Sequence, residues 1–366
     1  MTAAVVVIAC LLMFAAAVRA EPWPAEKANA WYAKQAWPVG CNFIPSSAIN
    51  QLEMWQADTF DLPTIKRELG WAKSLGFNTV RVFLHDIAYE QDPKGFLERV
   101  DAFLAACDEN GIKVMVVLFD SVWDPFPKAG KQRAPHPHVH NSGWVQGPGV
   151  PVLQNLKEHE ARLKAYVQAV VTKYKASPAV LCWDIINEPD NRNGSSYGKW
   201  EPNNKGDLAL ELMKKAYGWA REVGPEQPIT SGVWVGQWGD AGKLKAWEKW
   251  QLEQSDVISF HAYGDLKDLQ TRVNNLKRYG RPILCTEYMA RPIGSNFEPH
   301  LGWMKENKIG AYNWGFVNGK SQTIYPWDSW QKKYAGEPPV WFHDIFQTDG
   351  RAYREAEVEY IRKVTK

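Results

Sequence analysis

Cysteine is scarce in this sequence, with five residues in 366, and no two of them form a Cys-x-x-Cys pair. Cys10 lies in an apolar N-terminal segment, and the other four are far apart in the chain. Cys41, Cys182 and Cys285 fall in or beside predicted buried strands, where cysteine commonly serves as a small apolar side chain. The pattern argues against a thiolate metal site and against a disulfide framework.

The sequence also has little net charge and no run of basic residues. Its formal net charge is +2 at pH 7, whereas nucleic-acid-binding proteins typically carry a basic patch. Beyond residue 20, no stretch is long and apolar enough for a membrane helix. There is no internal repeat and no low-complexity linker. We therefore expect no nucleic-acid partner, no membrane span, and one large domain over residues 21–366. The oligomeric state is left open.

The first twenty residues resemble a signal peptide. Val5 to Val18 is apolar but too short to cross a bilayer, and Val18-Arg19-Ala20 resembles a cleavage site. The segment before Val5 lacks Lys and Arg, which is atypical. Lipid attachment at Cys10 is the alternative, although Cys10 lies very near the start. We expect a protein that is secreted or periplasmic after cleavage.

Two short apolar segments each lead into a glutamate. Val180 to Ile186 lies between two prolines and precedes Asn187-Glu188, and Pro282 to Cys285 precedes Thr286-Glu287. Short apolar runs of this kind are typical of strands that are covered on both faces of a parallel sheet. Glycoside hydrolysis requires two such carboxyl groups, one as proton donor and one as nucleophile or base.

Strands and helices alternate along most of the chain, after a lead-in over residues 21–38 that shows no clear period. Helices are predicted between the strands, each with one apolar face. An alternation of eight strands with helices predicts an α/β fold, specifically a single-domain (β/α)8 TIM barrel. The predicted strands are 39–43, 79–84, 113–119, 180–186, 228–233, 257–260, 282–285 and 310–314.

Polar and aromatic residues lie at or near the carboxyl ends of most predicted strands, which is where TIM barrels hold their active sites. Each has an ordinary alternative: Arg81 could form a structural ion pair, His261 could be a core histidine, and Trp314 could serve packing. Their shared position favours a site. The candidates are Asn42, Arg81, Asp120, Asn187, Glu188, Trp234, His261, Tyr263, Glu287 and Trp314.

Tryptophan is abundant, with 19 residues, and indole rings stack on the apolar faces of sugars as well as filling cores. Two long irregular segments, 121–155 and 315–348, favour a restricted cleft. The first contains His136, His138 and His140. Alternation would direct His138 away from the other two, and no carboxylate lies close in sequence. A solvated or substrate-facing loop is therefore favoured over a metal site, and no metal is expected.

The ordered set of motifs resembles clan A glycoside hydrolases, most closely family 5, the cellulase-like enzymes. Asn187-Glu188-Pro189 matches the motif of the acid/base, and Glu287 matches the nucleophile. The strand-two arginine, the His-x-Tyr motif and the last tryptophan match Arg81, His261-Ala262-Tyr263 and Trp314.

One position departs from the family pattern. Family members commonly carry a histidine after the third strand, where this chain has Phe119-Asp120-Ser121. His85, after the second strand, is one candidate to replace it. Membership of a divergent branch is the other explanation.

Together with the predicted signal peptide, the resemblance implies a secreted, retaining β-glycoside hydrolase that cleaves a β-linked glycan or oligosaccharide by double displacement without a cofactor. Arg81 and Tyr263 would favour the ionised form of Glu287. Repulsion from Glu287 would keep Glu188 protonated. Asn187 would hydrogen-bond the sugar 2-hydroxyl, and Trp314 would floor the reactive subsite.

Three alternatives remain open at this stage. The same residues would serve a transglycosylase. The barrel could bind carbohydrate without turnover, although both glutamates are present. A barrel enzyme of another class is the third. The sugar and the choice between endo and exo action are not determined by these motifs.

Overall fold

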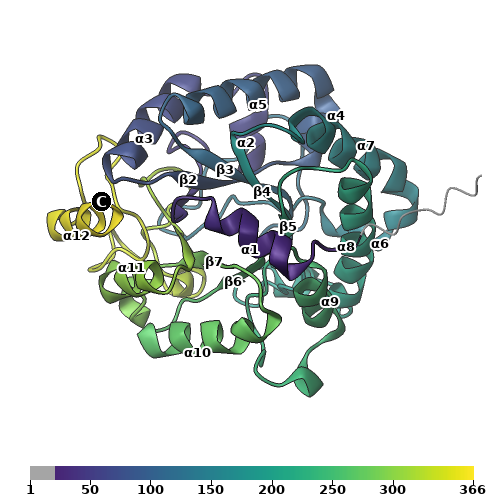
Figure 1. The fold of residues 1–366 in the computed structure, drawn as a ribbon. Coiled ribbons are helices and arrows are strands. Elements are labelled where there is room, and N and C mark those ends of the chain that lie inside the picture. Colours follow the sequence, from purple (N-terminus) through teal and green to yellow (C-terminus); the bar gives the residue numbers. More distant parts are fainter. Residues whose placement is uncertain (1–20) are drawn as a thin grey trace, which may run out of the picture.

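The computed structural model describes residues 21–366, so the predicted signal peptide lies outside the described residues. Eight parallel strands form one sheet in the order β5-β4-β3-β2-β1-β8-β7-β6, and a single bridge between Val233 and Phe260 joins its two edges. The predicted single-domain (β/α)8 barrel is therefore confirmed (Figure 1). The strands are β1 (Val39–Phe43), β2 (Thr79–Phe83), β3 (Lys113–Asp120), β4 (Val180–Asn187), β5 (Ile229–Thr230), β6 (Ile258–His261), β7 (Ile283–Tyr288) and β8 (Gly310–Asn313).

Helices surround the strands (Figure 1). In α3, Asp61 accepts a hydrogen bond from the Thr64 backbone at the start, and Ile65, Leu69 and Ala72 are buried. The helices between and after the strands are α2 (Gln51–Trp55), α3 (Leu62–Ser74), α4 (Asp86–Gln91), α5 (Pro93–Asp108), α6 (Val150–Gln154), α7 (Leu156–Tyr174), α8 (Lys205–Glu222), α9 (Ala246–Gln254), α10 (Leu266–Leu276), α11 (Phe297–Glu306) and α12 (Glu355–Thr365).

The lead-in contains a helix, α1 (Ala25–Ala33), that its sequence pattern did not indicate. α1 crosses one end of the barrel (Figure 1). Trp31 and Tyr32 pack there against an apolar cluster that includes Leu181 and Leu284, near the starts of β4 and β7. Only Ala28 of α1 is fully buried. Because so few residues of α1 are buried, its sequence shows no strong helical periodicity of apolar residues.

The predicted fifth strand is longer than the observed one. Only Ile229 and Thr230 pair with β4. At the next position the Ser231 hydroxyl donates to the Ile186 carbonyl at 2.9 Å. The Ser231 side chain thus occupies a backbone acceptor near the end of β4. The next pairing of this segment with the sheet is the bridge between Val233 and Phe260 of β6.

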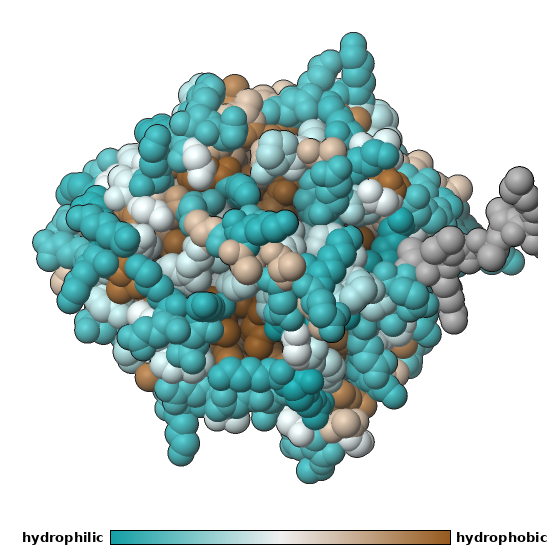
Figure 2. Space-filling model, viewed as in Figure 1, coloured by the Kyte–Doolittle hydropathy of each residue, from teal (hydrophilic) through white to brown (hydrophobic). Residues whose placement is uncertain are grey.

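The four described cysteines, Cys41, Cys107, Cys182 and Cys285, are buried and unpaired, as expected. Hydrophilic residues cover most of the face that carries α1 (Figure 2). None of the helices in residues 21–366 combines the length and apolar character that a membrane crossing requires.

Candidate active site

A cavity of about 340 Å³ lies at the carboxyl ends of the strands. Six predicted site residues line it: Asn187, Glu188, Trp234, Tyr263, Glu287 and Trp314. The other four do not line it: Asn42, Arg81, Asp120 and His261. Arg81, Asp120 and His261 form hydrogen bonds with residues that do, and Asn42 is held by Arg81. The structure thus divides the predicted set into a lining layer and a supporting layer.

Glu188 and Glu287 face the same small volume. One carboxylate oxygen of each and a ring nitrogen of His261 all lie within 4.8 Å of one another. Glu287 is held in β7, beside a shift of register between Cys285 and Tyr288. Glu188 directly follows β4 and has a φ of 42°, a left-handed conformation that costs of order 1–3 kcal/mol and is often found at functional sites.

Three polar side chains surround the Glu287 carboxylate. Arg81 Nη1 donates to Oε1 at 2.9 Å, and the Tyr263 hydroxyl donates to Oε2 at 2.7 Å. His261 Nδ1 lies 3.4 Å from Oε2. Burial and the charge of nearby Glu188 raise the pKa of Glu287, while Arg81 and the Tyr263 hydrogen bond act to lower it. The two donors favour the ionised carboxylate.

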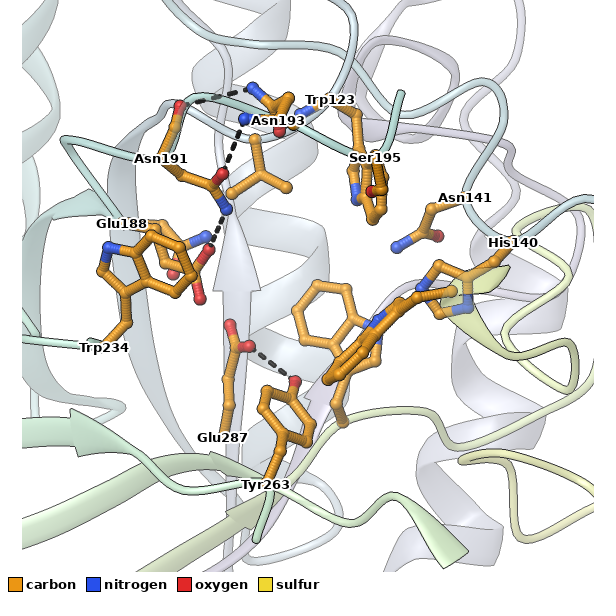
Figure 3. Close-up of a pocket in the computed structure, with 15 residues that line it drawn as sticks. Trp123, His140, Asn141, Glu188, Asn191, Asn193, Ser195, Trp234, Tyr263 and Glu287 are labelled. Atoms are coloured by element: carbon orange, nitrogen blue, oxygen red, sulfur yellow. Dashed lines mark hydrogen bonds between the residues drawn. The ribbon is translucent and has the colours of Figure 1, made fainter. Parts of the chain in front are cut away.

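Glu188 has a different environment. Its Oε2 accepts a hydrogen bond from Asn191 Nδ2 at 2.6 Å, and its Oε1 lies 2.7 Å from His261 Nδ1 (Figure 3). Burial raises the pKa of Glu188 to about 7, and the charge of Asp190 adds to this increase. The expected repulsion from Glu287 is therefore not the main cause. Desolvation of a buried carboxyl group is.

His261 is buried between the two glutamates. Burial lowers the pKa of His261 to about 4, so the ring is neutral at neutral pH. A neutral ring can donate to an ionised Glu188 or accept from a protonated one. His261 therefore contacts Glu188 as a neutral hydrogen-bonding group rather than as a cation.

Arg81 organises the layer beneath the cavity and is fully buried. Its Nε and Nη2 donate to Asp184 Oδ2 at 3.0 and 2.9 Å. Its Nη1 also donates to Asn42 Oδ1, and its Nη2 also donates to Asn187 Oδ1, both at 2.8 Å. Arg81 therefore does form a buried structural ion pair, with Asp184, and it also contacts Glu287. Asp184, two residues before Ile186, was missed because it lies inside an apolar run.

Asp120 occupies the position where family 5 members commonly carry histidine. Its Oδ1 accepts from Asn187 Nδ2 at 3.0 Å, and its Oδ2 accepts from Trp144 Nε1 at 2.6 Å and Gln51 Nε2 at 3.0 Å. Burial raises the pKa of Asp120 to about 6. Asp120 fixes the Asn187 amide, so that Asn187 has one Nδ2 hydrogen left for a ligand.

His85 does not replace the missing histidine. It is fully buried; its Nε2 lies 3.0 Å from the Gln146 carbonyl, and its Nδ1 accepts from the Ile87 backbone at 3.2 Å. It does not line the cavity. Its two ring nitrogens instead hold the start of α4 and the loop after β3.

The histidine loop lies against the cavity. His138 Nδ1 contacts the Tyr334 carbonyl at 2.7 Å, and His140 Nδ1 contacts the Tyr325 carbonyl at 2.8 Å. His140 lines the cavity, so the substrate-facing alternative holds for this residue. Within residues 21–366, one group of three potential metal ligands was found, formed by Glu188, His261 and Glu287.

Several lining residues were missed because they belong to loops without a period. Their only signal in the sequence was the length of the loops and the tryptophans within them. They are Val122, Trp123, His140, Asn141, Asn191, Asn193, Gly194, Ser195 and Trp327.

Comparisons with known proteins agree on one family. The family model described as cellulase (glycosyl hydrolase family 5) matches residues 42–332. A probable mannan endo-1,4-beta-mannosidase F from Aspergillus flavus is 32% identical over 276 residues, which cover 69% of this chain and 52% of that protein. A mannan endo-1,4-beta-mannosidase A from Emericella nidulans is 28% identical over 96 residues, which cover 26% of this chain and 22% of that protein. The chain thus spans about half or less of the length of these relatives.

Solved structures share the fold. An exo-beta-1,4-mannosidase from an Opitutaceae bacterium has a TM-score of 0.56 at 22% identity, covering 89% of this chain and 59% of that one. A beta-mannanase from the blue mussel Mytilus edulis has a TM-score of 0.56 at 14% identity, covering 89% of this chain and 91% of that one. The match of the family model over most of the barrel identifies the chain as a member of glycosyl hydrolase family 5.

Proposed function

We propose that this protein is a retaining β-glycoside hydrolase in which Glu287 is the nucleophile and Glu188 is the acid/base. The observation that carries the proposal is the proximity of the two carboxylates, since one oxygen of Glu188 lies within 4.8 Å of one oxygen of Glu287. Retaining enzymes hold their carboxyl groups about 5 Å apart, whereas inverting enzymes separate them by about 6.5–9.5 Å to admit a water molecule.

In the first step, a Glu287 oxygen bonds to the anomeric carbon as the glycosidic bond breaks, and Glu188 gives its proton to the leaving oxygen. A pKa of about 7 for Glu188 keeps that proton available at mildly acidic pH. The hydrogen bonds from Arg81 and Tyr263 favour the ionised nucleophile.

In the second step, a water molecule gives a proton to Glu188 and attacks the anomeric carbon, and the bond to Glu287 breaks. The glycosyl-enzyme has lost the charge of Glu287, which removes a nearby negative charge and lowers the pKa of Glu188. His261 Nδ1, 2.7 Å from Glu188 Oε1, can donate a hydrogen bond to Glu188 when that carboxylate is ionised.

Mannose is the sugar we propose, in β-1,4-linked chains. The support is the relative from Aspergillus flavus, whose name describes it as a probable mannan endo-1,4-beta-mannosidase. Trp314 and Trp234, which line the cavity, supply aromatic surface for sugar rings. The apolar N-terminal segment supports export, and sequencing the N-terminus of the secreted protein would test cleavage after Ala20.

Covalent trapping tests the mechanism. The protein is incubated with 2-deoxy-2-fluoro-β-mannosyl fluoride and with its gluco counterpart, and intact mass is followed by peptide mapping. One adduct on Glu287, formed fastest with the manno reagent, is the expected result. An adduct on another residue would overturn the assignment. Absence of any adduct, together with no hydrolysis of β-mannan or β-glucan, would favour a barrel that binds carbohydrate without turnover.

A further inference from the structure

The two long loops after β3 and β8 are joined to each other beside the cavity. The His140 backbone N–H donates to Ser329 Oγ at 3.0 Å, and Trp330 Nε1 donates to the His140 carbonyl at 2.9 Å. The ring of Trp330 stacks on that of Trp123, with centroids 5.6 Å apart and planes 10° apart. These contacts join the two loops into one structure beside the cavity. We call it the wall, and it is formed here by Trp123, His140 and Trp330.

A third loop, after β4, reinforces this wall. Asn193 Oδ1 accepts from the Trp123 backbone at 2.8 Å, and the Tyr197 ring packs edge-on against Trp330 at 5.4 Å. Asn193 Nδ2 in turn donates to Glu201, which pairs with buried Lys205 at 2.8 Å. The wall is therefore anchored in α8, and it is built as a fixed part of the barrel.

The part of the wall formed by His140 stands at the end of the cavity away from Glu188. Figure 3 shows Glu188 and Trp234 at one end, Asn141 and His140 at the opposite end, and Glu287 and Tyr263 between them. Glu188, as proton donor, marks the side of the leaving group. The sugar attacked by Glu287 therefore extends toward Asn141 and His140.

A narrow space separates Asn141 from the ends of β1 and β2. The other cavity found beside this residue, lined also by Trp144, Trp314 and Phe83, has a volume of about 20 Å³, which is enough for about one water molecule. The Asn141 backbone N–H donates to the Ser321 carbonyl at 2.9 Å, and this fixes the residue to the loop after β8.

The Asn141 side chain has the properties of a ligand contact. It points into the cavity (Figure 3), and the residue is 1% exposed. Its Oδ1 is buried and has no hydrogen-bond partner among the described residues. A buried amide oxygen without a partner costs about 1–3 kcal/mol, and a bound hydroxyl group would remove that cost. Its φ of 45° is a further sign that the surrounding contacts hold this residue in place.

We infer that this protein removes single sugars from the non-reducing end of its substrate, and that Asn141 binds the C4 hydroxyl of the terminal sugar. The inference rests on the proposed function. C4 lies opposite C1 in a pyranose ring, so the C4 oxygen of the attacked sugar faces the wall. In the interior of a 1,4-linked chain that oxygen carries another sugar, which would meet Asn141 and the wall. Only a chain end has the free hydroxyl that Asn141 can bind.

The products of the unmodified enzyme test exo action directly. Mannopentaose is reduced with borohydride to mark its reducing end, and the first products are separated by chromatography. Release of mannose and the reduced tetrasaccharide is expected. Early release of mannobiose or mannotriose would overturn the inference but leave the proposed hydrolase in place. Absence of hydrolysis, with no trapped adduct on Glu287, would instead remove the proposed function itself.

The role of Asn141 is tested with 4-nitrophenyl β-mannopyranoside and its 4-deoxy analogue. The unmodified enzyme should prefer the parent compound by roughly 5- to 100-fold in kcat/KM, the value of one buried hydrogen bond. In Asn141→Ala this preference should fall to near one, while Asn203→Ala, at an exposed position of the loop after β4, keeps it. A preference that survives in a folded Asn141→Ala variant would overturn the assignment.

Discussion

Arg81 Nη1 lies 2.9 Å from Glu287 Oε1, and the same guanidinium group binds Asp184 deep in the barrel. Arg81 and Asp184 are fully buried. One cation therefore serves both as a structural partner for an interior carboxylate and as a hydrogen-bond donor to the proposed nucleophile. A side chain with both roles links the stability of the barrel to the ionisation of its active site.

Substitution Arg81→Met should affect stability and pH dependence together. Breaking a buried ion pair costs about 3–5 kcal/mol in the free energy of unfolding, since Asp184 would remain buried without a cation. Arg81 acts to lower the pKa of Glu287, so its loss should raise that pKa and move the acidic limb of kcat/KM to higher pH.

Thermal unfolding and a pH–rate profile measure these two effects. Arg351→Met is the matched control, because Arg351 forms an exposed ion pair with Asp349, and exposed pairs contribute about 0–1 kcal/mol. An active Arg81→Met variant with an unchanged acidic limb would contradict the role in ionisation.

Substitution Glu287→Gln should lower kcat by roughly 10⁴-fold or more, a loss typical of removing a nucleophile. The amide cannot form the covalent intermediate, yet its size preserves the packing. Steady-state kinetics on an aryl β-mannoside would measure the loss, with circular dichroism to verify folding. Glu253→Gln, on the exposed side of α9, should keep full activity. Substantial turnover by Glu287→Gln would exclude Glu287 as the nucleophile.

Removal of the proton donor should depend on the leaving group. Glu188→Ala should lose about 10²–10⁴-fold, the usual range for general acid catalysis, on mannooligosaccharides, whose leaving group needs a proton. The first step should be far less affected with a 2,4-dinitrophenyl β-mannoside, whose leaving group needs none. Pre-steady-state release of dinitrophenol would show this difference. Equal losses on both substrates would argue against Glu188 as the acid.

The decrease of kcat/KM at high pH should follow the ionisation of Glu188. Its pKa of about 7 predicts that kcat/KM falls as pH rises above 7, because the proton donor becomes ionised. Asn191 donates to the carboxylate and lowers the pKa of Glu188, so Asn191→Ala should move the basic limb to higher pH. Asn203→Ala serves as the control in the same loop. A limb that moves to lower pH in Asn191→Ala would contradict the assignment.

The buried pair Lys205–Glu201 should stabilise the wall. Substitution Lys205→Met leaves Glu201 without its cation, which should cost about 3–5 kcal/mol in the free energy of unfolding. Chemical denaturation would measure the cost. Lys249→Met, which removes an exposed partner of Glu253 at 3.9 Å, should change stability by less than about 0.5 kcal/mol. Equal changes in the free energy of unfolding for the two substitutions would show that the buried pair does not stabilise the wall.

The ends of the strands could be predicted from the sequence because they depend on patterns of neighbouring residues. Apolar runs of strand length ended at Asn187-Glu188 and near Glu287, and parallel strands in a barrel must place such ends at one face. The supporting layer was identified for the same reason: Arg81 is a charge within a strand, which must be buried with partners. α1 was missed because it buries too little surface to impose a period.

The barrel and the pair of glutamates could be predicted from the amino-acid sequence, since both follow from patterns that are local in the chain. The rest of the site depends on contacts between segments that are far apart in the chain. The cause of the raised pKa of Glu188 is burial, which depends on every segment packed around it. The wall joins His140 to Trp330 across 190 residues of sequence, and the Asn141 backbone is bonded to Ser321 of the loop after β8. Loops carry no period, so their positions are set by the surfaces that they meet.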